Sequence, residues 1–244
     1  APSRQRLTRR KVKLPPSRAE APEENLDDLP KVEGMVVAQF PGGATVRADD
    51  GEEMLCAIAK TFRAPEGSTP LAICDRVTVA LTRPEHASDE LADEKDRADG
   101  MLLAREPRAS ALSRPQPFRG KRRDPYETEE FEKVIVANVD VLVIVTAAMD
   151  PPVRPGLIDR FCILADRGEL EPVIVLNKID LGEPPADAMS YLASLDVPLV
   201  RCSAATAEGV RDLLARLTGR RAVLAGASGV GKTTLVNDII PAAD

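Results

Sequence analysis

A glycine-rich stretch, GASGVGKT at 226–233, has the spacing of a phosphate-binding loop. Its glycines let backbone N–H groups approach a triphosphate, because no side chain stands in the way. Lys232 would reach the β- and γ-phosphates, and the hydroxyl of Thr233 would hold Mg²⁺. A strand is expected at 220–229 and a helix at 232–240, and this context argues against a chance glycine-rich turn. The residues expected to bind nucleotide phosphates are Gly226, Ala227, Ser228, Gly229, Val230, Gly231, Lys232, Thr233 and Thr234.

A second polar group, Asn177-Lys178-Ile179-Asp180, ends a predicted buried strand at 171–180. Ligands of open α/β sheets bind beyond the carboxyl ends of the strands. The Asp180 carboxylate could accept hydrogen bonds from N1–H and the 2-amino group of guanine, whereas adenine would present a lone pair at N1. Two such bonds, at about 1.5–3 kcal/mol each, would favour guanine by orders of magnitude. Asn177 is expected at the O6/N7 edge and the stem of Lys178 over the base, although such a group is also typical of a plain turn.

The third motif is the pair Ser203-Ala204, at the end of a strand predicted at 197–204. Small residues there would let a backbone N–H reach guanine O6, although the pair alone is a weak signal. All three motifs follow strands of one predicted sheet, so we expect them to line the same edge. Together they predict a guanine-nucleotide site whose metal ligand is Thr233, while the catalytic residues stay unknown.

Residues 134–244 carry the elements that would position these motifs. An apolar run at 140–148 is typical of a strand buried on both faces. Strands and helices then alternate with short connections, which predicts a doubly wound, mostly parallel sheet. The helices are expected at 155–168, 187–195, 208–217 and 232–240.

Residues 31–104 have a different pattern, with short apolar runs separated by turn signals at 41–43 and 49–51. This pattern predicts a small all-β barrel, and a five-stranded barrel of the oligonucleotide/oligosaccharide-binding (OB) type is the natural interpretation. An SH3-like barrel is the alternative, since strand count alone does not separate the two. Residues 1–30 are polar, proline-rich and basic and predict a disordered arm. Residues 105–133 predict a Pro- and Arg-rich linker.

The overall composition narrows the class of protein. The 244 residues are 43% apolar but only 3% aromatic, so aliphatic side chains must fill the core. The net charge is −6, yet cations cluster at 4–13 and 119–123, where they could contact RNA phosphates or simply favour solubility. The four cysteines are not spaced as a zinc knuckle or redox pair and predict reduced core thiols. No apolar run is long enough to predict a membrane span.

The three motifs resemble those of the small GTPases in a changed order, with the phosphate loop last, and a circular permutation explains that order. A small barrel precedes the permuted domain. The stretches between and within them are EPRASALSRP, VANVDVLVIVTAA, LIDRFCILAD and EPVIVLNKIDL. With these features, residues 32–240 resemble the RsgA/YjeQ family of circularly permuted, ribosome-dependent GTPases.

The resemblance implies GTP/GDP and Mg²⁺ as ligands, with the nucleotide contacts at 177–180, 203–204 and 226–234. It implies GTP hydrolysis stimulated by the small ribosomal subunit, contact with its rRNA and a late role in its maturation. A cytoplasmic, monomeric protein without membrane association is the corresponding expectation.

The family continues beyond the phosphate-loop helix with two switch regions, a D-x-P-G motif and a zinc-binding domain, none of which this sequence contains. We therefore expect a G domain that is incomplete after that helix, with Zn²⁺ only in the absent domain. Weak binding and slow hydrolysis are the consequence, because phosphoryl transfer depends on positioning. An RNA-binding, nucleotide-sensing module without turnover is the alternative function. An ATP-dependent kinase or ATPase is a third, against which Asp180 argues.

Overall fold

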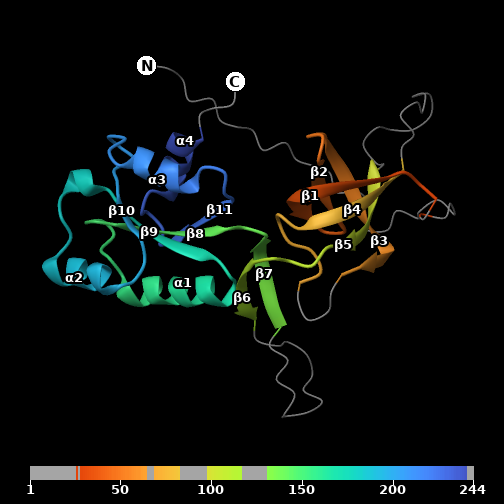
Figure 1. Ribbon diagram of the computed structural model, residues 1–244. Coiled ribbons are helices and arrows are strands. Elements are labelled where there is room, and N and C mark those ends of the chain that lie inside the picture. Colours follow the sequence, from red (N-terminus) through yellow and green to blue (C-terminus); the bar gives the residue numbers. More distant parts are fainter. Residues whose placement is uncertain (1–25, 27, 65–68, 83–97, 117–130, 241–244) are drawn as a thin grey trace, which may run out of the picture. The chain divides into compact units, whose positions relative to one another are not determined.

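The computed structural model describes residue 26 and residues 28–64, 69–82, 98–116 and 131–240 (Figure 1). The predicted basic arm, apart from residues 26 and 28–30, and the cationic cluster at 119–123 lie outside these ranges. Two compact units make up the chain, which we call the barrel unit and the α/β unit: residues 1–66 with 75–107, and residues 67–74 with 108–244. Within the described ranges, no helix has the length and apolar character needed to cross a membrane.

Five strands form the barrel unit, in the closed order β1-β2-β3-β5-β4. Neighbouring strands are antiparallel except β3 and β5, which are parallel, and β1 closes the barrel against β4. This order is that of an OB-type barrel, so the first interpretation is confirmed over the SH3-like alternative. The strands are β1 (Lys31–Phe40), β2 (Gly43–Ala48), β3 (Glu53–Arg63), β4 (Arg76–Leu81) and β5 (Gly100–Arg105).

Aliphatic side chains fill the barrel, as the composition required. Val46 in β2, Val77 and Val79 in β4 and Leu102 in β5 are fully buried. A buried ion pair accompanies them: the Arg105 guanidinium lies 4.0 Å from the carboxylate of Asp75, whose exposure is 0%. A buried charge is costly without a partner, so the pairing explains how both residues are accommodated.

Strand β6 (Ala111–Gln116) lies in the range predicted as a linker, and strand β7 (Phe131–Ala137) begins there. These strands pair antiparallel, so the two ends of the segment 105–133 are not a simple connector. The chain between β3 and β4 also belongs to the α/β unit, where Ile73 pairs with Val136. These pairings were not predicted, because a Pro- and Arg-rich sequence carries little strand signal.

The predicted α/β architecture is confirmed, with a parallel sheet in the order β10-β9-β8-β11. Observed helices begin and end within about two residues of their predicted bounds, as helix ends commonly do. Strand β11, which comes last in the sequence, occupies one edge of the sheet beside β8. The elements are β8 (Val141–Ala147), α1 (Pro155–Arg167), β9 (Glu171–Asn177), a 3₁₀ turn (Ile179–Leu181), α2 (Ala186–Ser194), β10 (Leu199–Arg201), α3 (Val210–Leu217), β11 (Ala222–Gly226) and α4 (Lys232–Ile239).

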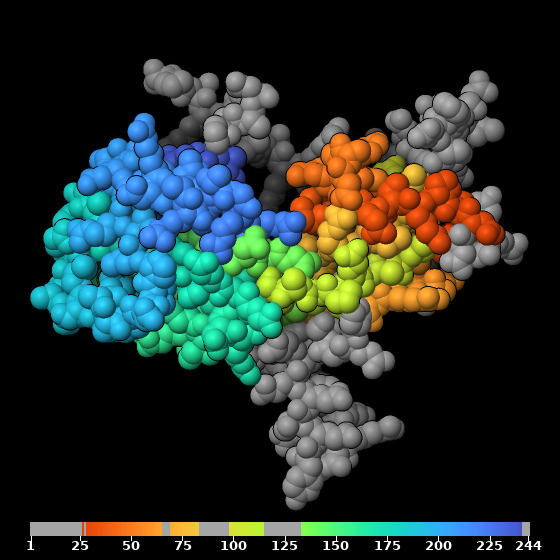
Figure 2. All heavy atoms as spheres, viewed as in Figure 1, coloured from red at the N-terminus to blue at the C-terminus, as the bar shows by residue number. Residues whose placement is uncertain are grey.

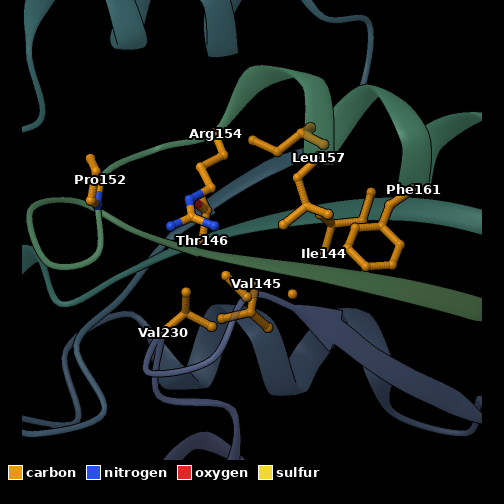
Figure 3. Close-up of a pocket in the computed structure, with 11 residues that line it drawn as sticks. Ile144, Val145, Thr146, Pro152, Arg154, Leu157, Phe161 and Val230 are labelled. Atoms are coloured by element: carbon orange, nitrogen blue, oxygen red, sulfur yellow. The ribbon is translucent and has the colours of Figure 1, made fainter.

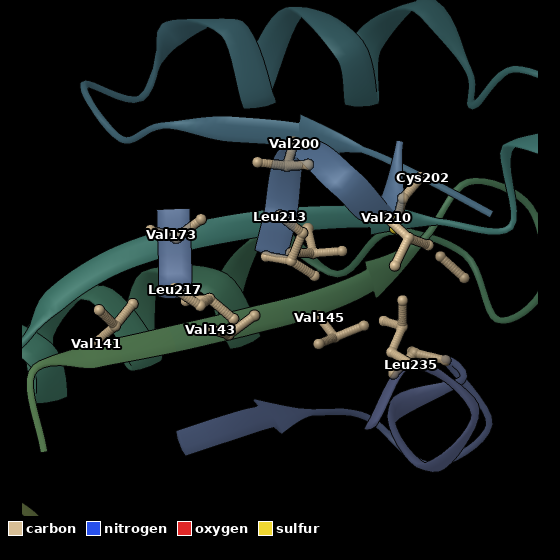
Figure 4. Packing of buried hydrophobic residues seen from close by; sticks show 13 residues of the cluster. Val141, Val143, Val145, Val173, Val200, Cys202, Val210, Leu213, Leu217 and Leu235 are labelled. Carbon is tan, nitrogen blue, oxygen red and sulfur yellow. The ribbon is translucent and has the colours of Figure 1, made fainter. Parts of the chain in front are cut away.

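Helices cover both faces of this sheet. Figure 1 shows α3 and α4 on one face and α1 and α2 on the other. On the first face, Leu213 of α3 and Leu235 of α4 pack with alternate residues of β8, such as Val143 (Figure 4). On the second, Ile158 of α1 packs with the intervening residues, such as Ile144. Alternation along β8 therefore buries both of its faces, as the continuous apolar run predicted.

The cysteines predict an alkaline loss of stability. None of the four described cysteines is in a disulfide; Cys56 and Cys202 are buried, whereas Cys74 and Cys162 are half-buried. Burial raises the pKa of Cys56 to about 12 and of Cys202 to about 11 from the ordinary 9.0. The folded chain therefore holds these protons more tightly than the unfolded chain. We expect stability from this source to be full below pH 9 and to fall as pH rises toward 11.

Urea unfolding at pH values below 9 and near 11 tests this expectation. Below pH 9, the Cys202→Ala variant should have a lower urea midpoint than the parent chain. Between pH 9 and 11, the midpoint of the variant should fall less than that of the parent. An equal alkaline loss in both proteins would show that other groups cause it.

Candidate nucleotide-binding site

The phosphate loop connects β11 to α4, as its motif predicted. Gly229 and Gly231 adopt positive φ angles of 81° and 95°, a region that side chains with a Cβ rarely occupy. A Cβ at Gly231 would also overlap the amide nitrogen of Asn177, and one at Gly226 would overlap the Val145 carbonyl oxygen. These glycines are thus required by packing as well as by access to phosphates, a constraint that the motif alone did not indicate.

Lys232 and Val230 hold the loop from inside. The Lys232 ammonium donates to the carbonyl oxygens of Gly226, at 3.1 Å, and Ala227, at 2.6 Å. The Val230 side chain is 2% exposed and packs into the cluster that contains Leu235. The anchored loop therefore has a fixed path across the end of the sheet.

The remaining predicted phosphate residues are open to a ligand. Ser228 and Gly229 are exposed at the tip of the loop, and Thr233 and Thr234 are exposed in the first turn of α4. The first turn of a helix presents unpaired N–H groups and the positive end of the helix dipole. This part of the loop has the chemistry that a chain of phosphates requires.

Asn177 joins all three motifs. Its Nδ2 donates to the Val230 carbonyl oxygen at 2.8 Å, and its Oδ1 accepts from the Ala204 N–H at 3.1 Å. The Cys202 thiol donates to the same Oδ1 at 3.7 Å, and Asn177 is 1% exposed. The predicted convergence of the motifs at one edge of the sheet is therefore found. Sequence reasoning missed this bond network, because it joins residues 53 positions apart.

The same network constrains the roles predicted for the base. The Ala204 N–H already donates to Asn177, so a contact with guanine O6 would have to share its hydrogen. An amide nitrogen carries two hydrogens, so the bond to Val230 leaves Asn177 one donor for the O6/N7 edge. In this structure, the hydrogen bonds of Asn177 connect the phosphate loop to the Ser203-Ala204 loop.

Asp180 and Lys178, which follow Asn177 in the sequence, are held by hydrogen bonds of their own. The Ser203 hydroxyl donates to Asp180 Oδ1 at 2.5 Å and accepts from the Thr206 N–H at 3.2 Å. One oxygen of the exposed Asp180 carboxylate is thereby fixed, and the other can face a ligand. Lys178 donates from its ammonium to the Asp150 carbonyl oxygen, which holds both ends of the side chain. The roles predicted for the pair, at the edge and over the plane of a guanine, stay predictions.

A shallow pocket borders the phosphate loop on the α1 side of the sheet (Figure 3). Ile144, Leu157 and Phe161 form an apolar wall, and in Figure 3 the Arg154 side chain points toward Thr146. An apolar wall is not the lining that a triphosphate needs, so we place the phosphates on the loop itself. Across the described ranges, no cluster of three or more His, Cys, Asp or Glu side chains could hold a metal ion.

Comparisons with known proteins agree with this geometry. A family model described as RsgA GTPase matches residues 105–244. The small ribosomal subunit biogenesis GTPase RsgA of Shewanella oneidensis is 32% identical over 220 residues, which are 88% of this chain and 55% of that protein. The chain thus spans about half the length of that curated relative.

Solved structures show the same architecture. The crystal structure of YjeQ from Thermotoga maritima matches with a TM-score of 0.61 and 28% identity, over 88% of this chain and 67% of that one. That of YloQ, a circularly permuted GTPase, has a TM-score of 0.57 and 23% identity, covers 87% and 65% of the two chains, and supports the fold alone. The permuted order, the three motifs on one sheet edge and the family match lead to one conclusion: the chain belongs to the RsgA GTPase family.

Proposed function

We propose that this chain is the GTP-binding and GTP-hydrolysing part of an assembly factor that acts in late maturation of the small ribosomal subunit. The relatives named small ribosomal subunit biogenesis GTPase RsgA support this proposal. The observation that carries it is the Asn177 bond network, which joins the phosphate loop to the Ser203-Ala204 motif beside Asp180. A guanine nucleotide is the ligand whose two ends these motifs fit.

Each motif then has a defined task. The loop N–H groups and Lys232 bind the phosphates, and Asp180 selects guanine. Asn177 keeps the phosphate loop in place beside the base-binding residues. Thr233 would hold Mg²⁺, which neutralises phosphate charge when bound. Lys232 would add a phosphate contact to the bonds it already makes with the carbonyl oxygens of Gly226 and Ala227.

The proposal extends to partners and location. The small subunit and its rRNA would stimulate turnover, and the barrel and the cationic clusters would contribute RNA contacts. The protein would act as a cytoplasmic monomer. Any Zn²⁺ would be bound by a further domain outside this sequence.

A second function is a nucleotide-sensing, RNA-binding module without turnover. This function requires only the nucleotide-binding motifs, since Asn177, Asp180 and the phosphate loop account for binding and not for the positioning of an attacking water. This module would bind GTP and GDP at the same residues.

Phosphate release from GTP, measured with no subunits, with small subunits and with large subunits, separates the two. Stimulation by small subunits alone is the expected result. Binding of GTP without turnover under all three conditions would favour the sensing module, and equal use of ATP would contradict both proposals.

A further inference from the structure

Strand β3 contains an irregular segment in the barrel. Its parallel pairing with β5 runs from Cys56 to Ile58 and resumes only at Arg63, so four residues of β3 face a single residue of β5. Pairing with β2 ends at Ala57. Residues 59–62 are therefore released from both ladders. Bulges of this kind bend a strand and redirect its side chains, often next to a binding site.

The redirected segment contains two cationic side chains and an aromatic one. Lys60 and Arg63 are exposed, Phe62 is half-buried between them in the sequence, and the neighbouring Ile58 is 37% exposed. Within the ranges that the structure describes, the side chains of Lys60 and Arg63 make no ion pair or hydrogen bond. Both charges are thus available to an external anion. We call residues 60–63 the β3 bulge segment.

The face on which OB-type barrels most often bind oligonucleotides is less suited to a polyanion here. On strands β2 and β3, Arg47 pairs with the Glu53 carboxylate at 2.6 Å, and both side chains are about half exposed. The Phe40 ring packs against Gly43 so closely that a Cβ there would overlap it. Arg47 is therefore neutralised, and the nearby Phe40 ring is already covered. Figure 2 shows β2 and β3, in orange, at the surface of the barrel unit.

We propose that the β3 bulge segment binds single-stranded RNA. Lys60 and Arg63 would contact two backbone phosphates, and Phe62 would stack on a base between them, as aromatic side chains do in non-specific single-strand sites. This proposal rests on the proposed function, since it names the RNA contact of the barrel. It differs in placing that contact at the end of β3 and not on the neutralised β2–β3 face.

Single-stranded RNA fits better than a duplex or a peptide. A duplex hides its bases, so the Phe62 ring would have no stacking partner. An acidic peptide could neutralise the two cations but offers no ring for Phe62, unless an aromatic residue lies at the right spacing.

Fluorescence anisotropy with a short labelled single-stranded RNA, titrated with the 244-residue chain over a range of salt concentrations, tests the proposal. The Lys60→Ala and Arg63→Ala changes should each lower the slope of log K against log salt by about 0.7. The Phe62→Leu change, which keeps an apolar side chain, should weaken binding about tenfold with an unaltered slope. The Arg47→Ala variant is the matched control, since it removes an exposed arginine that is already paired, and it should bind as the parent does.

Each outcome of this experiment either supports the proposal or overturns it. Equal binding by the parent and the three segment variants, a larger loss in Arg47→Ala, or equal affinity for a duplex would overturn the proposal. Binding of labelled GDP and the thermal unfolding of every variant are measured alongside, so that misfolding is recognised and replaced by the milder Lys60→Gln or Arg63→Gln change. GTP turnover stimulated by small subunits, with no affinity for single-stranded RNA, would reject this proposal and leave the proposed function in place.

Discussion

The Gly231→Ala variant is expected to bind GTP and GDP at least about 100-fold more weakly than the parent chain. The new Cβ would overlap the amide nitrogen of Asn177 and break the bond from Asn177 to Val230, which holds the phosphate loop against the base-binding loops. Losing a buried hydrogen bond costs about 1–3 kcal/mol, and a side chain at a φ of 95° adds a similar strain. Since about 1.4 kcal/mol is tenfold in affinity, the two effects give the expected loss. Titration with a fluorescent GDP analogue measures it.

Gly229→Ala is the matched control for this effect. Gly229 also has a positive φ, 81°, but the nearest atom to its added Cβ would be Cδ of Pro151 at 3.8 Å. This variant carries backbone strain without the collision, so we expect a loss of about tenfold. If the two variants lose the same affinity, strain alone is responsible, and the role assigned to Asn177 is wrong.

Asp180→Asn should convert the base preference from guanine to xanthine. An amide in place of the carboxylate would direct a donor at the N1–H and 2-amino donors of guanine, whereas the 2-oxo group of xanthine can accept from it. Loss of two hydrogen bonds to a charged group corresponds to a decrease in GTP affinity of at least about 100-fold. Competition of GTP, XTP and ATP against a fluorescent GDP analogue measures the change.

Ser203→Ala serves as the intermediate variant. It removes the hydroxyl that donates to Asp180 Oδ1 but leaves the carboxylate in place. GTP affinity should fall by only about tenfold, with guanine still preferred to xanthine. Unchanged GTP affinity in Asp180→Asn would show that this carboxylate does not contact the base.

The α/β unit was predictable because its signals are local. The apolar run of β8 and the glycine spacing of the phosphate loop are each complete within ten residues of sequence. Parallel pairing then places the carboxyl ends of neighbouring strands together, so the edge of the sheet that carries the motifs could be predicted from the sequence. The roles of individual residues at that edge remain predictions.

Features that depend on distant pairings could not be predicted in the same way. The second role of Asn177, the tie to Val230, needs the exact approach of two loops that are far apart in sequence. The pairing of β6 with β7 joins strands on either side of an intervening segment and has only weak local signals. The bulge in β3 is visible only against the register of β5, since its sequence reads as an ordinary strand end.

The position of β11 has a consequence for how the protein is made. Strands β8, β9 and β10 leave the exit tunnel of a translating ribosome in order and can pair as they emerge, together with the Asn177–Asp180 and Ser203-Ala204 motifs. Under the proposed function, the nascent chain cannot bind a nucleotide until β11 pairs with β8 and brings the phosphate loop to the edge of the sheet. Under the proposed function, the phosphate loop is thus made after the Asn177–Asp180 and Ser203-Ala204 motifs, whereas a chain with its phosphate loop first would make the two halves of the site in the opposite order.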